Sequence, residues 1–486
     1  MQMPKGKALL FAAGIVASAL IYGCGGSSSN NIIPSVVSIF DAHNAVFRNN
    51  TALVTAGYNG FGQLGFDFGN LSDQTVYHPI AQNIVAFTNH TTGARIGGVA
   101  VGAAHTVAFG RPAPFSNITG QSLAYAWGSN YHGQLGNGTV TPTTGSAAYS
   151  RIPLRVGPKT YLTTDAVGTP NGGPLTGVTA VAAGGFHSVA LRGSDGAVFT
   201  WGYNGYGELG NNNFTDSPWP VPVLAYPGGQ NDRLEKITAI ASGADHVLAL
   251  RIDGTLFAWG DNTYGQCGQD NSIPANLRVG YAKPVVFPSN PGIAQIAAGG
   301  TFSVALANDM KTMFFWGNNI GHPDVSTLSL ATPMPLFIPS AVQNHNIVKI
   351  SAGLDHIVIL LDNGTVYAIG FNSYGQLGDA TVVSRPVTII GNTTFSNRTT
   401  AWANFSTATH GSTRFGIYSS AASLLAHGEW LADDISAFGH STMVHIVGKG
   451  WYGWGDNGHG QLGQPISTTS IGYILSAVPV AGAQEF

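Results

Sequence analysis

Short runs of alternating apolar and polar residues occupy most of the chain. Residues 188–191 (Ser-Val-Ala-Leu) and 198–201 (Val-Phe-Thr-Trp) show the period of two that is typical of strands. Asp-Gly pairs lie between such runs, as at Asp195-Gly196 and Asp253-Gly254, and they favour tight hairpin turns. The pattern therefore predicts short strands that pair with their sequence neighbours in antiparallel order.

A decapeptide, Trp-Gly-x-Asn-x-x-Gly-Gln-Leu-Gly, recurs at the end of one of these strands. Four clear, two weaker and one decayed copy begin at Trp127, Trp201, Trp259, Trp454, Ala56, Ile369 and Trp316. Their leading glycines lie 53 to 85 residues apart. Such a period indicates one repeat architecture rather than several unrelated domains.

A second motif precedes the decapeptides and is clearest at 182–191 (AAGGFHSVAL). Two further apolar runs flank the pair in several repeats. One leads into the second motif, as at 177–182, and the other follows the decapeptide and carries proline, as at 284–286, which suits an edge strand. Three or four strands in each of seven repeats predict an all-β fold, a seven-bladed β-propeller over residues 36–486.

The two ends of the predicted propeller differ in a way that indicates how the ring closes. The chain finishes with a proline run at 477–480 and begins with a second motif at 36–43 that has no proline run before it. We therefore expect the N- and C-terminal strands to complete one blade together, which would remove an open sheet edge.

The start of the chain differs from the rest. Residues 1–23 have a basic beginning and a short apolar run, which predicts a signal peptide that is too short to favour a membrane span. Cys24 follows in a context that resembles a bacterial lipobox, although Tyr22 stands where a small residue is usual, and residues 24–35 form a polar tether. We expect lipidation of Cys24 and an outer-membrane or cell-surface location. Cleavage after 17–19 (Ala-Ser-Ala), which gives a periplasmic or secreted protein, is the alternative.

Composition limits the possible partners. Only 9% of the residues are charged and the formal net charge is −3, without the basic stripe of a nucleic-acid binder. If Cys24 is lipidated, Cys267 is the one cysteine left, so no intramolecular disulfide can form. We expect a monomer that does not bind nucleic acid and reaches the membrane only through its lipid anchor.

The sequence contains no recognisable catalytic constellation. The G-x-G-x-x-G matches fall in the repeated loops with no helical pattern after them, which argues against a dinucleotide site. A histidine recurs in the second motif and is replaced once by Phe302; we interpret it as a structural imidazole at a blade junction and predict no catalytic residue, metal or cofactor. The recurring histidines are His43, His105, His187, His246, His356 and His440.

Together the motifs G-x-x-H-S-x-A-L and W-G-x-N-x-x-G-Q-L-G resemble the repeats of the regulator of chromosome condensation family over about residues 36–480. The resemblance implies a seven-bladed propeller. The founding member is a nucleotide exchange factor for a small nuclear GTPase, whereas the export signal points to the bacterial secreted branch, similar in repeat to β-lactamase inhibitor protein II. In the exchange factor, loops with the Asp/His part of the second motif face the partner, and the matching residues here are His105, His187, Asp245, His246, Asp355, His356 and His440.

We therefore expect a non-enzymatic scaffold or inhibitor that binds an unknown protein partner in a bacterial envelope. An exchange-factor-like regulator and a glycan-binding or glycan-active propeller are the alternatives. An insert at about 391–434, where the repeat spacing is largest, offers Trp402 and Trp430 as further anchors for a partner. The same two side chains could instead cover an exposed blade edge.

Overall fold

The computed structural model describes most of the repeat region. The described residues are 36–38, 43–48, 52–65, 77–83, 95–111, 122–140, 149–157, 175–225, 232–320, 329–379, 381–385, 387, 403–404, 431–463 and 473–480. The predicted signal peptide, Cys24 and the tether lie outside them, as do Trp402 and Trp430. Among the described residues, no helix has the length and hydrophobicity needed to cross a membrane.

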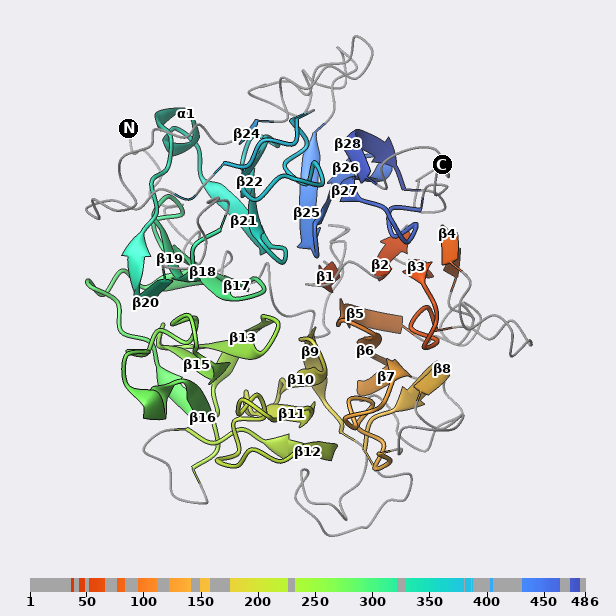
Figure 1. The fold of residues 1–486 in the computed structure, drawn as a ribbon, viewed down its shortest axis with the longest axis vertical. Coiled ribbons are helices and arrows are strands. Elements are labelled where there is room, and N and C mark those ends of the chain that lie inside the picture. The colour runs from red at the N-terminus through yellow and green to blue at the C-terminus, as the bar shows by residue number, and fades with distance from the viewer. Residues whose placement is uncertain are drawn as a thin grey trace, which may run out of the picture.

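Seven sheets, numbered I to VII in chain order, stand radially around one axis (Figure 1). Sheet I holds β2 (His43–Arg48), β3 (Ala52–Tyr58) and β4 (Tyr77–Asn83). Blade II holds β5 (Arg95–Val101), β6 (His105–Arg111), β7 (Leu123–Ser129) and β8 (Tyr149–Arg155). Blade III holds β9 (Val178–Ala183), β10 (His187–Arg192), β11 (Val198–Gly202) and β12 (Ser217–Pro222). Blade IV holds β13 (Ile237–Ser242), β14 (His246–Arg251), β15 (Leu256–Asp261) and β16 (Arg278–Pro284).

The second half of the ring repeats this order. Blade V holds β17 (Ile293–Ala298), β18 (Phe302–Ala307), β19 (Met313–Asn318) and β20 (Ser329–Pro335). Blade VI holds β21 (Ile347–Ala352), β22 (His356–Leu361), β23 (Val366–Gly370) and β24 (Ala403–Asn404). Blade VII holds β25 (Ala432–Phe438), β26 (Ser441–Ile446), β27 (Gly450–Asp456) and β28 (Tyr473–Pro479). The described helices are the short η4 (Pro274–Asn276) and α1 (Ser340–Gln343).

The all-β propeller is confirmed, but the predicted seven equivalent blades are not. In the described part of the chain, six sheets are complete blades with at least four strands, whereas sheet I has three. The strand β1 (Val36–Ser38), expected in the first blade, pairs in parallel with β5 and joins the inner edge of blade II. The described residues therefore form six blades plus one incomplete sheet.

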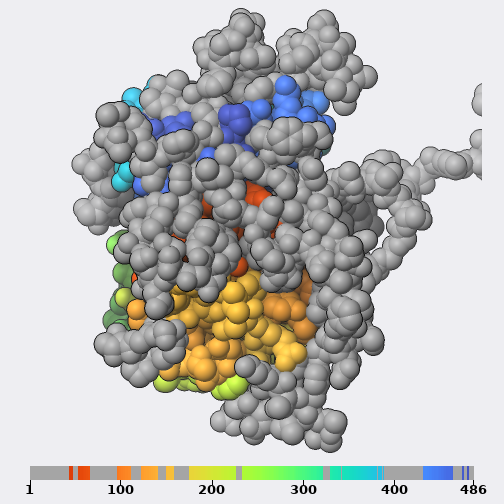
Figure 2. All heavy atoms as spheres, turned by 90° about the vertical axis from the view of Figure 1, so that its right-hand side faces the viewer, coloured from red at the N-terminus to blue at the C-terminus, as the bar shows by residue number. Residues whose placement is uncertain are grey.

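The predicted closure by a shared blade is also wrong. The last strand, β28, pairs antiparallel with β27 and so belongs to blade VII. The reason is the order of the repeat: the proline strand follows the decapeptide of its own blade, so the C-terminal run needs no partner from the start of the chain. The ring closes by side-chain packing instead. Figure 2 shows sheet I, in red, between the blue C-terminal strands and the orange blade II.

One buried cluster carries this closure. It joins Val46 and Leu53 of sheet I with Phe438 and Met443 of blade VII and Trp127 of blade II. Each of these side chains contributes roughly 1.5–3 kcal/mol when it leaves water. Asn44 also donates a hydrogen bond from its side-chain amide to the main-chain carbonyl of Gln461, across the same junction.

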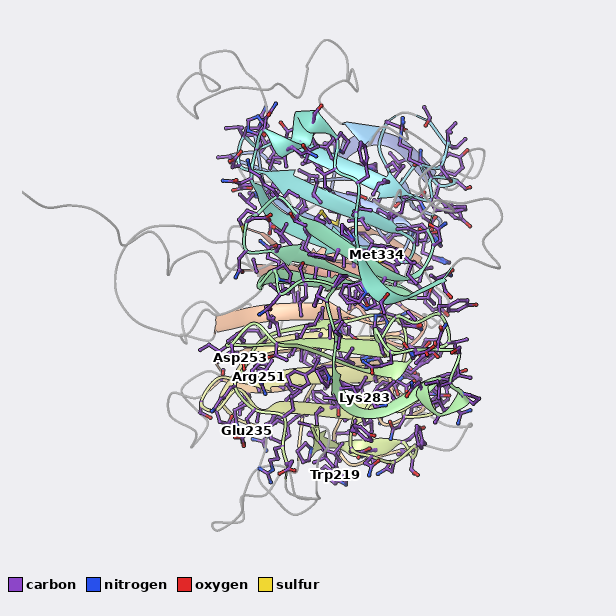
Figure 3. All side chains as sticks on the ribbon, turned by 90° about the vertical axis from the view of Figure 1, so that its left-hand side faces the viewer. Trp219, Glu235, Arg251, Asp253, Lys283 and Met334 are labelled. Atoms are coloured by element: carbon purple, nitrogen blue, oxygen red, sulfur yellow. The ribbon has the colours of Figure 1, made fainter. Side chains whose placement is uncertain are left out.

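The antiparallel order gives the ring two different faces. The turns between the first and second strands and the decapeptide loops lie on one face, which we call the decapeptide face. The hairpins between the second and third strands lie on the opposite turn face. Figure 3, an edge-on view, shows Arg251, Asp253 and Glu235 together on the turn face. There the Arg251 guanidinium pairs with Asp253, 2.8 Å from Nη2 to Oδ2, beside the Asp-Gly turn.

Candidate functional site

The decapeptide builds the seam between consecutive blades. The main-chain carbonyl of its eighth residue accepts a hydrogen bond from the indole of the next blade, at 2.8–3.0 Å. The tryptophan–carbonyl pairs are Trp127–Gln63, Trp201–Gln134, Trp259–Glu208, Trp316–Gln266 and Trp454–Gln376. These indoles are almost completely buried, so each seam joins a large apolar side chain to a satisfied polar group. The repeated Trp and Gln therefore have a structural role.

The recurring histidine belongs to the same seam. Its Nε2 lies 2.8–3.0 Å from a hydroxyl oxygen of the next blade, in the pairs His43–Thr106, His105–Ser188, His187–Ser242, His246–Ser303 and His356–Thr442. In four of these pairs the hydroxyl donates in turn to the carbonyl of the decapeptide's eighth residue. Because the hydroxyl proton is used in that hydrogen bond, the hydroxyl oxygen accepts the bond from the imidazole, which must donate from Nε2.

Burial keeps four of these imidazoles neutral. It is the main cause that lowers the pKa of His43, His105, His187 and His246 to about 3, with a further contribution from neighbouring histidines at His43 and His187. A charged ring would lose its hydration without gaining a carboxylate. The second motif also needs its glycine here, because a Cβ on Gly184 would lie 2.1 Å from Cε1 of His187.

The seam between blades V and VI departs from this arrangement as a unit. Phe302 replaces the histidine, Ile357 the hydroxyl residue and Ile369 the tryptophan, while the decapeptide from Trp316 has decayed. Phe302, Ile320, Ile357 and Ile369 are buried in one apolar cluster. Replacing both partners of a buried hydrogen bond by apolar groups is nearly neutral, whereas replacing one leaves an unsatisfied group. This explains why the histidine, the hydroxyl residue, the tryptophan and the decapeptide of this seam all differ together.

The structure therefore places the predicted face residues in two environments. His105, His187, His246 and His356 are fully buried, so their side chains are held in the seams and are not available to a partner in this conformation. The loops beside these histidines, and not their side chains, can therefore lie on the predicted partner-binding face. Asp245, Asp355 and His440 lie at the surface of the decapeptide face and are partly exposed.

His440 is not the equivalent of the other histidines. The residue opposite the decapeptide glycine is His246 in blade IV and His356 in blade VI, but Ser441 in blade VII. The sequence alignment of His440 with the ring was thus wrong by one residue. His440 instead matches Asp355, and its Nε2 lies 3.3 Å from Asp355 Oδ2.

The exposed part of the decapeptide face carries a ring of aromatic side chains. The sixth decapeptide position is aromatic in every described repeat except the decayed one: Phe61, His132, Tyr206, Tyr264, Tyr374 and His459. Tyr206, Tyr264 and Tyr374 are 36–38% exposed, and Phe186 and Tyr131 extend the ring at 40% and 38%. Several rings touch their neighbours, such as His132 and Tyr203 at 4.9 Å and His440 and Tyr374 at 4.6 Å between centroids.

The turns beneath this ring are joined around the axis. The main-chain N–H in the middle of one turn donates to a carbonyl of the next, through Ala103–Gly185, Gly185–Ala244, Ala244–Gly300, Gly300–Leu354 and Leu354–Gly439, at 2.7–3.2 Å. The aromatic side chains are thus held on a rigid base. Rigid, half-exposed tyrosines are good anchors for a protein partner because little side-chain entropy is lost on binding.

Sequence reasoning treated the decapeptide mainly as blade packing and missed the aromatic ring. The available signal was the aromatic residue at the sixth position of six copies. Among the described residues, no group of three or more histidine, cysteine or acidic side chains has the geometry to hold a metal ion.

Comparisons with known proteins agree with the repeat pattern. Residues 123–191, 195–250, 253–306 and 363–405 match the regulator of chromosome condensation (RCC1) repeat, and a second description of this repeat matches 178–208, 237–266 and 347–376. The ultraviolet-B receptor UVR8 of Arabidopsis thaliana is 27% identical over 378 residues, which covers 74% of this chain and 72% of the receptor. The probable E3 ubiquitin-protein ligase HERC6 of Homo sapiens is 35% identical over 207 residues, which covers 41% of this chain but only 19% of the ligase.

Solved structures show the same fold. Yeast RCC1 (Prp20), in its complex with Kap60, superimposes with a TM-score of 0.60 at 18% identity, over 94% of this chain and 90% of that one. Human WBSCR16 gives a TM-score of 0.59 at 19% identity, over 85% and 86% of the two chains. At these identities the likeness concerns the propeller alone.

Proposed function

Because this chain belongs to the regulator of chromosome condensation (RCC1) repeat family, we propose that it is a non-enzymatic propeller that binds a protein partner through the aromatic ring of its decapeptide face. The observation that carries the proposal is the set of half-exposed tyrosines at equivalent positions on a rigid base. The solved relatives agree with this kind of role, since yeast RCC1 (Prp20) has been crystallised with Kap60 and studied for binding to Gsp1p and histones.

Truncation of the ring tests the binding face. The triple variant Tyr206→Ala, Tyr264→Ala and Tyr374→Ala should weaken partner capture at least about tenfold, because single aromatic anchors often contribute more than 1 kcal/mol. The measurement is quantitative pull-down from an envelope extract, followed by titration of the enriched protein.

The matched control removes exposed apolar side chains from the turn face, with Ile252→Ala and Val447→Ala, which are 74% and 54% exposed in the parent. This control should bind as the parent does. Equal capture by the parent and the tyrosine variant would contradict the proposed face. If the double variant Trp402→Ala and Trp430→Ala is the one that loses capture, the insert at about 391–434 is the binding site.

We also propose an envelope location with a lipid anchor at Cys24. The support is the signal-like segment at 1–23 and the polar tether at 24–35. Stable attachment needs more than one acyl chain, as in a mature bacterial lipoprotein. Cys24→Ala should therefore move the protein from the membrane pellet to the soluble fraction after cell breakage. Unchanged fractionation of this variant would contradict lipidation.

A glycan ligand is the second candidate, because exposed aromatic rings such as those of Tyr206 and Tyr264 also offer flat apolar surfaces to sugars. Retention of the parent, and loss by the triple tyrosine variant, on cell-wall polysaccharide resin would favour it over a protein partner.

A further inference from the structure

One acidic side chain on the decapeptide face lacks a histidine partner that its counterpart has. Asp245 and Asp355 occupy the same position in blades IV and VI, each directly before the seam histidine. Asp355 pairs with His440 of the next blade. At the position of His440, the blade after Asp245 carries Thr301, which cannot supply a charge. No described cationic side chain pairs with Asp245.

Two further carboxyl groups are buried near Asp245, and neither supplies a positive charge. Glu208 is fully buried nearby; its Oε2 accepts a hydrogen bond from the Tyr206 N–H at 2.9 Å, and its Oε1 has no partner. Asp261 is buried in the same region and is satisfied by Thr263 and Gln266. One oxygen of the buried Glu208 carboxyl group thus has no partner, and it lies near the partly exposed Asp245. A donor from outside the chain would be stabilised at such a place.

The pKa values agree with this geometry. Burial, with the Asp261 charge in addition, raises the pKa of Asp245 to about 6. Burial, with smaller contributions from Asp245 and Asp261, raises the pKa of Glu208 to about 8. Burial also acts to raise the pKa of Asp355. The hydrogen bonds and charges of its histidine partners outweigh this effect, so the pKa of Asp355 lies below the ordinary value. The two equivalent aspartates thus differ because Asp355 has histidine partners, whereas Asp245 has the Asp261 charge near it instead.

Two aromatic residues lie near Asp245 on the decapeptide face. Phe186 precedes the seam histidine of blade III as Asp245 does in blade IV, and the adjacent Gly185 N–H donates to the Ala244 carbonyl at 2.7 Å. Tyr203 is close enough for the Asp245 charge to contribute to raising its pKa, after the larger effects of burial and Glu208. Rings beside a carboxylate form a favourable environment for a guanidinium or ammonium group. The chain itself shows such a contact, with the Arg278 guanidinium 5.6 Å from the centre of the Tyr206 ring.

We propose that Asp245, with Phe186 and Tyr203 near it, is the site that receives an arginine or lysine side chain from the protein partner. The inference rests on the proposed function and adds the chemistry of the contact. The partner's side chain would take the place at Asp245 that the His440 side chain takes at Asp355 within the chain. The surface where blades III and IV meet is thereby distinguished from the rest of the aromatic ring.

A peptide titration tests the site directly. A tetra-arginine peptide should bind the full mature chain at least about tenfold more tightly than a tetra-citrulline peptide, which has the same shape without charge. Asp245→Asn should remove most of this difference. Asp355→Asn is the matched control and should leave the affinity within about twofold, since Asp355 already has His440 as its partner.

A second variant keeps the test decisive if Asp245→Asn folds poorly. Thr301→His copies the arrangement of blades VI and VII and should weaken peptide binding at a pH where the new imidazole is charged, without removing the carboxylate. Equal losses in Asp245→Asn and Asp355→Asn, or no loss in Asp245→Asn and Thr301→His, would overturn the site. Equally tight binding of free spermine would overturn a protein side chain as the ligand.

The outcome is separable from that of the proposed function. If the tyrosine variant loses partner capture while Asp245→Asn keeps both peptide and partner, the decapeptide face is the binding surface and the Asp245 inference is wrong. If Asp245→Asn loses both the peptide and the partner while the tyrosine variant keeps the partner, the Asp245 site exists and the tyrosines are not the partner's anchors.

Discussion

The free energy of unfolding should fall by about 4 kcal/mol between pH 7 and pH 5. The cause is the seam histidines His43, His105, His187 and His246, whose pKa is lowered from 6.5 to about 3 in the fold. As the pH falls below 6.5, these histidines bind protons in the unfolded chain but stay neutral in the folded chain. The free energy of unfolding therefore decreases. At pH 5 each histidine costs roughly 2 kcal/mol, or roughly 8 kcal/mol for four.

Two carboxyl groups act in the opposite direction. Glu208 and Asp245 have raised pKa values, of about 8 and about 6, so the folded chain binds their protons first as the pH falls. Between pH 7 and pH 5 these two groups together add about 4 kcal/mol to the free energy of unfolding. The effect of the histidines is therefore the larger one. The net loss of unfolding free energy is a large part of the ordinary stability of a domain.

Urea unfolding at half-unit steps from pH 7.5 to pH 4.5 measures this dependence. The control His246→Phe with Ser303→Ile copies the apolar seam of blades V and VI and should reduce the proton uptake on unfolding by about one. A wild-type stability that is flat from pH 7 to pH 5 would show that the seam imidazoles titrate normally or are not buried.

Glu208→Gln is expected to stabilise the protein, most strongly in alkali. Glu208 stands where other decapeptides have Gln63, Gln134, Gln266, Gln376 and Gln461. Because burial raises its pKa from 4.5 to about 8, the unfolded chain ionises first as the pH rises, and stability falls until about pH 8. The neutral amide avoids this loss. The gain should be under about 1 kcal/mol at pH 5, about 3 kcal/mol at pH 7 and about 5 kcal/mol at pH 8.5.

The reverse substitution is the control. Gln134→Glu introduces a carboxyl group at the same position of blade II, where the parent amide donates to Ser129 Oγ at 3.3 Å. It should destabilise the protein with the opposite pH trend. The same urea measurements serve both variants. A Glu208→Gln gain that does not grow between pH 5 and pH 8.5 would mean that Glu208 is ionised or hydrated in the fold.

Local sequence determined the strands, their antiparallel order and the propeller class. Each of these depends on short-range rules: alternation over four to seven residues, Asp-Gly turns and a repeated decapeptide, all visible within one repeat. The resemblance to the RCC1 repeat rested on the same local motifs and is confirmed. The repeated motifs did not show at which strand each blade begins and ends. The C-terminal run was therefore assigned to the first blade, although β28 pairs with β27.

The roles of the repeated residues were decided only by the tertiary structure. His105 and Trp201 appear in different repeats, and only the packing of blade II against blade III shows that both end at the carbonyl of Gln134, through Ser188 in one case. The one-residue offset of His440 likewise follows from strand register, which side-chain spacing alone leaves undetermined. Asp245 and Asp355 look alike in sequence, but their charges depend on a residue of the neighbouring blade. The hydrogen bonds across a seam join residues at least 37 positions apart, and no local pattern encodes them.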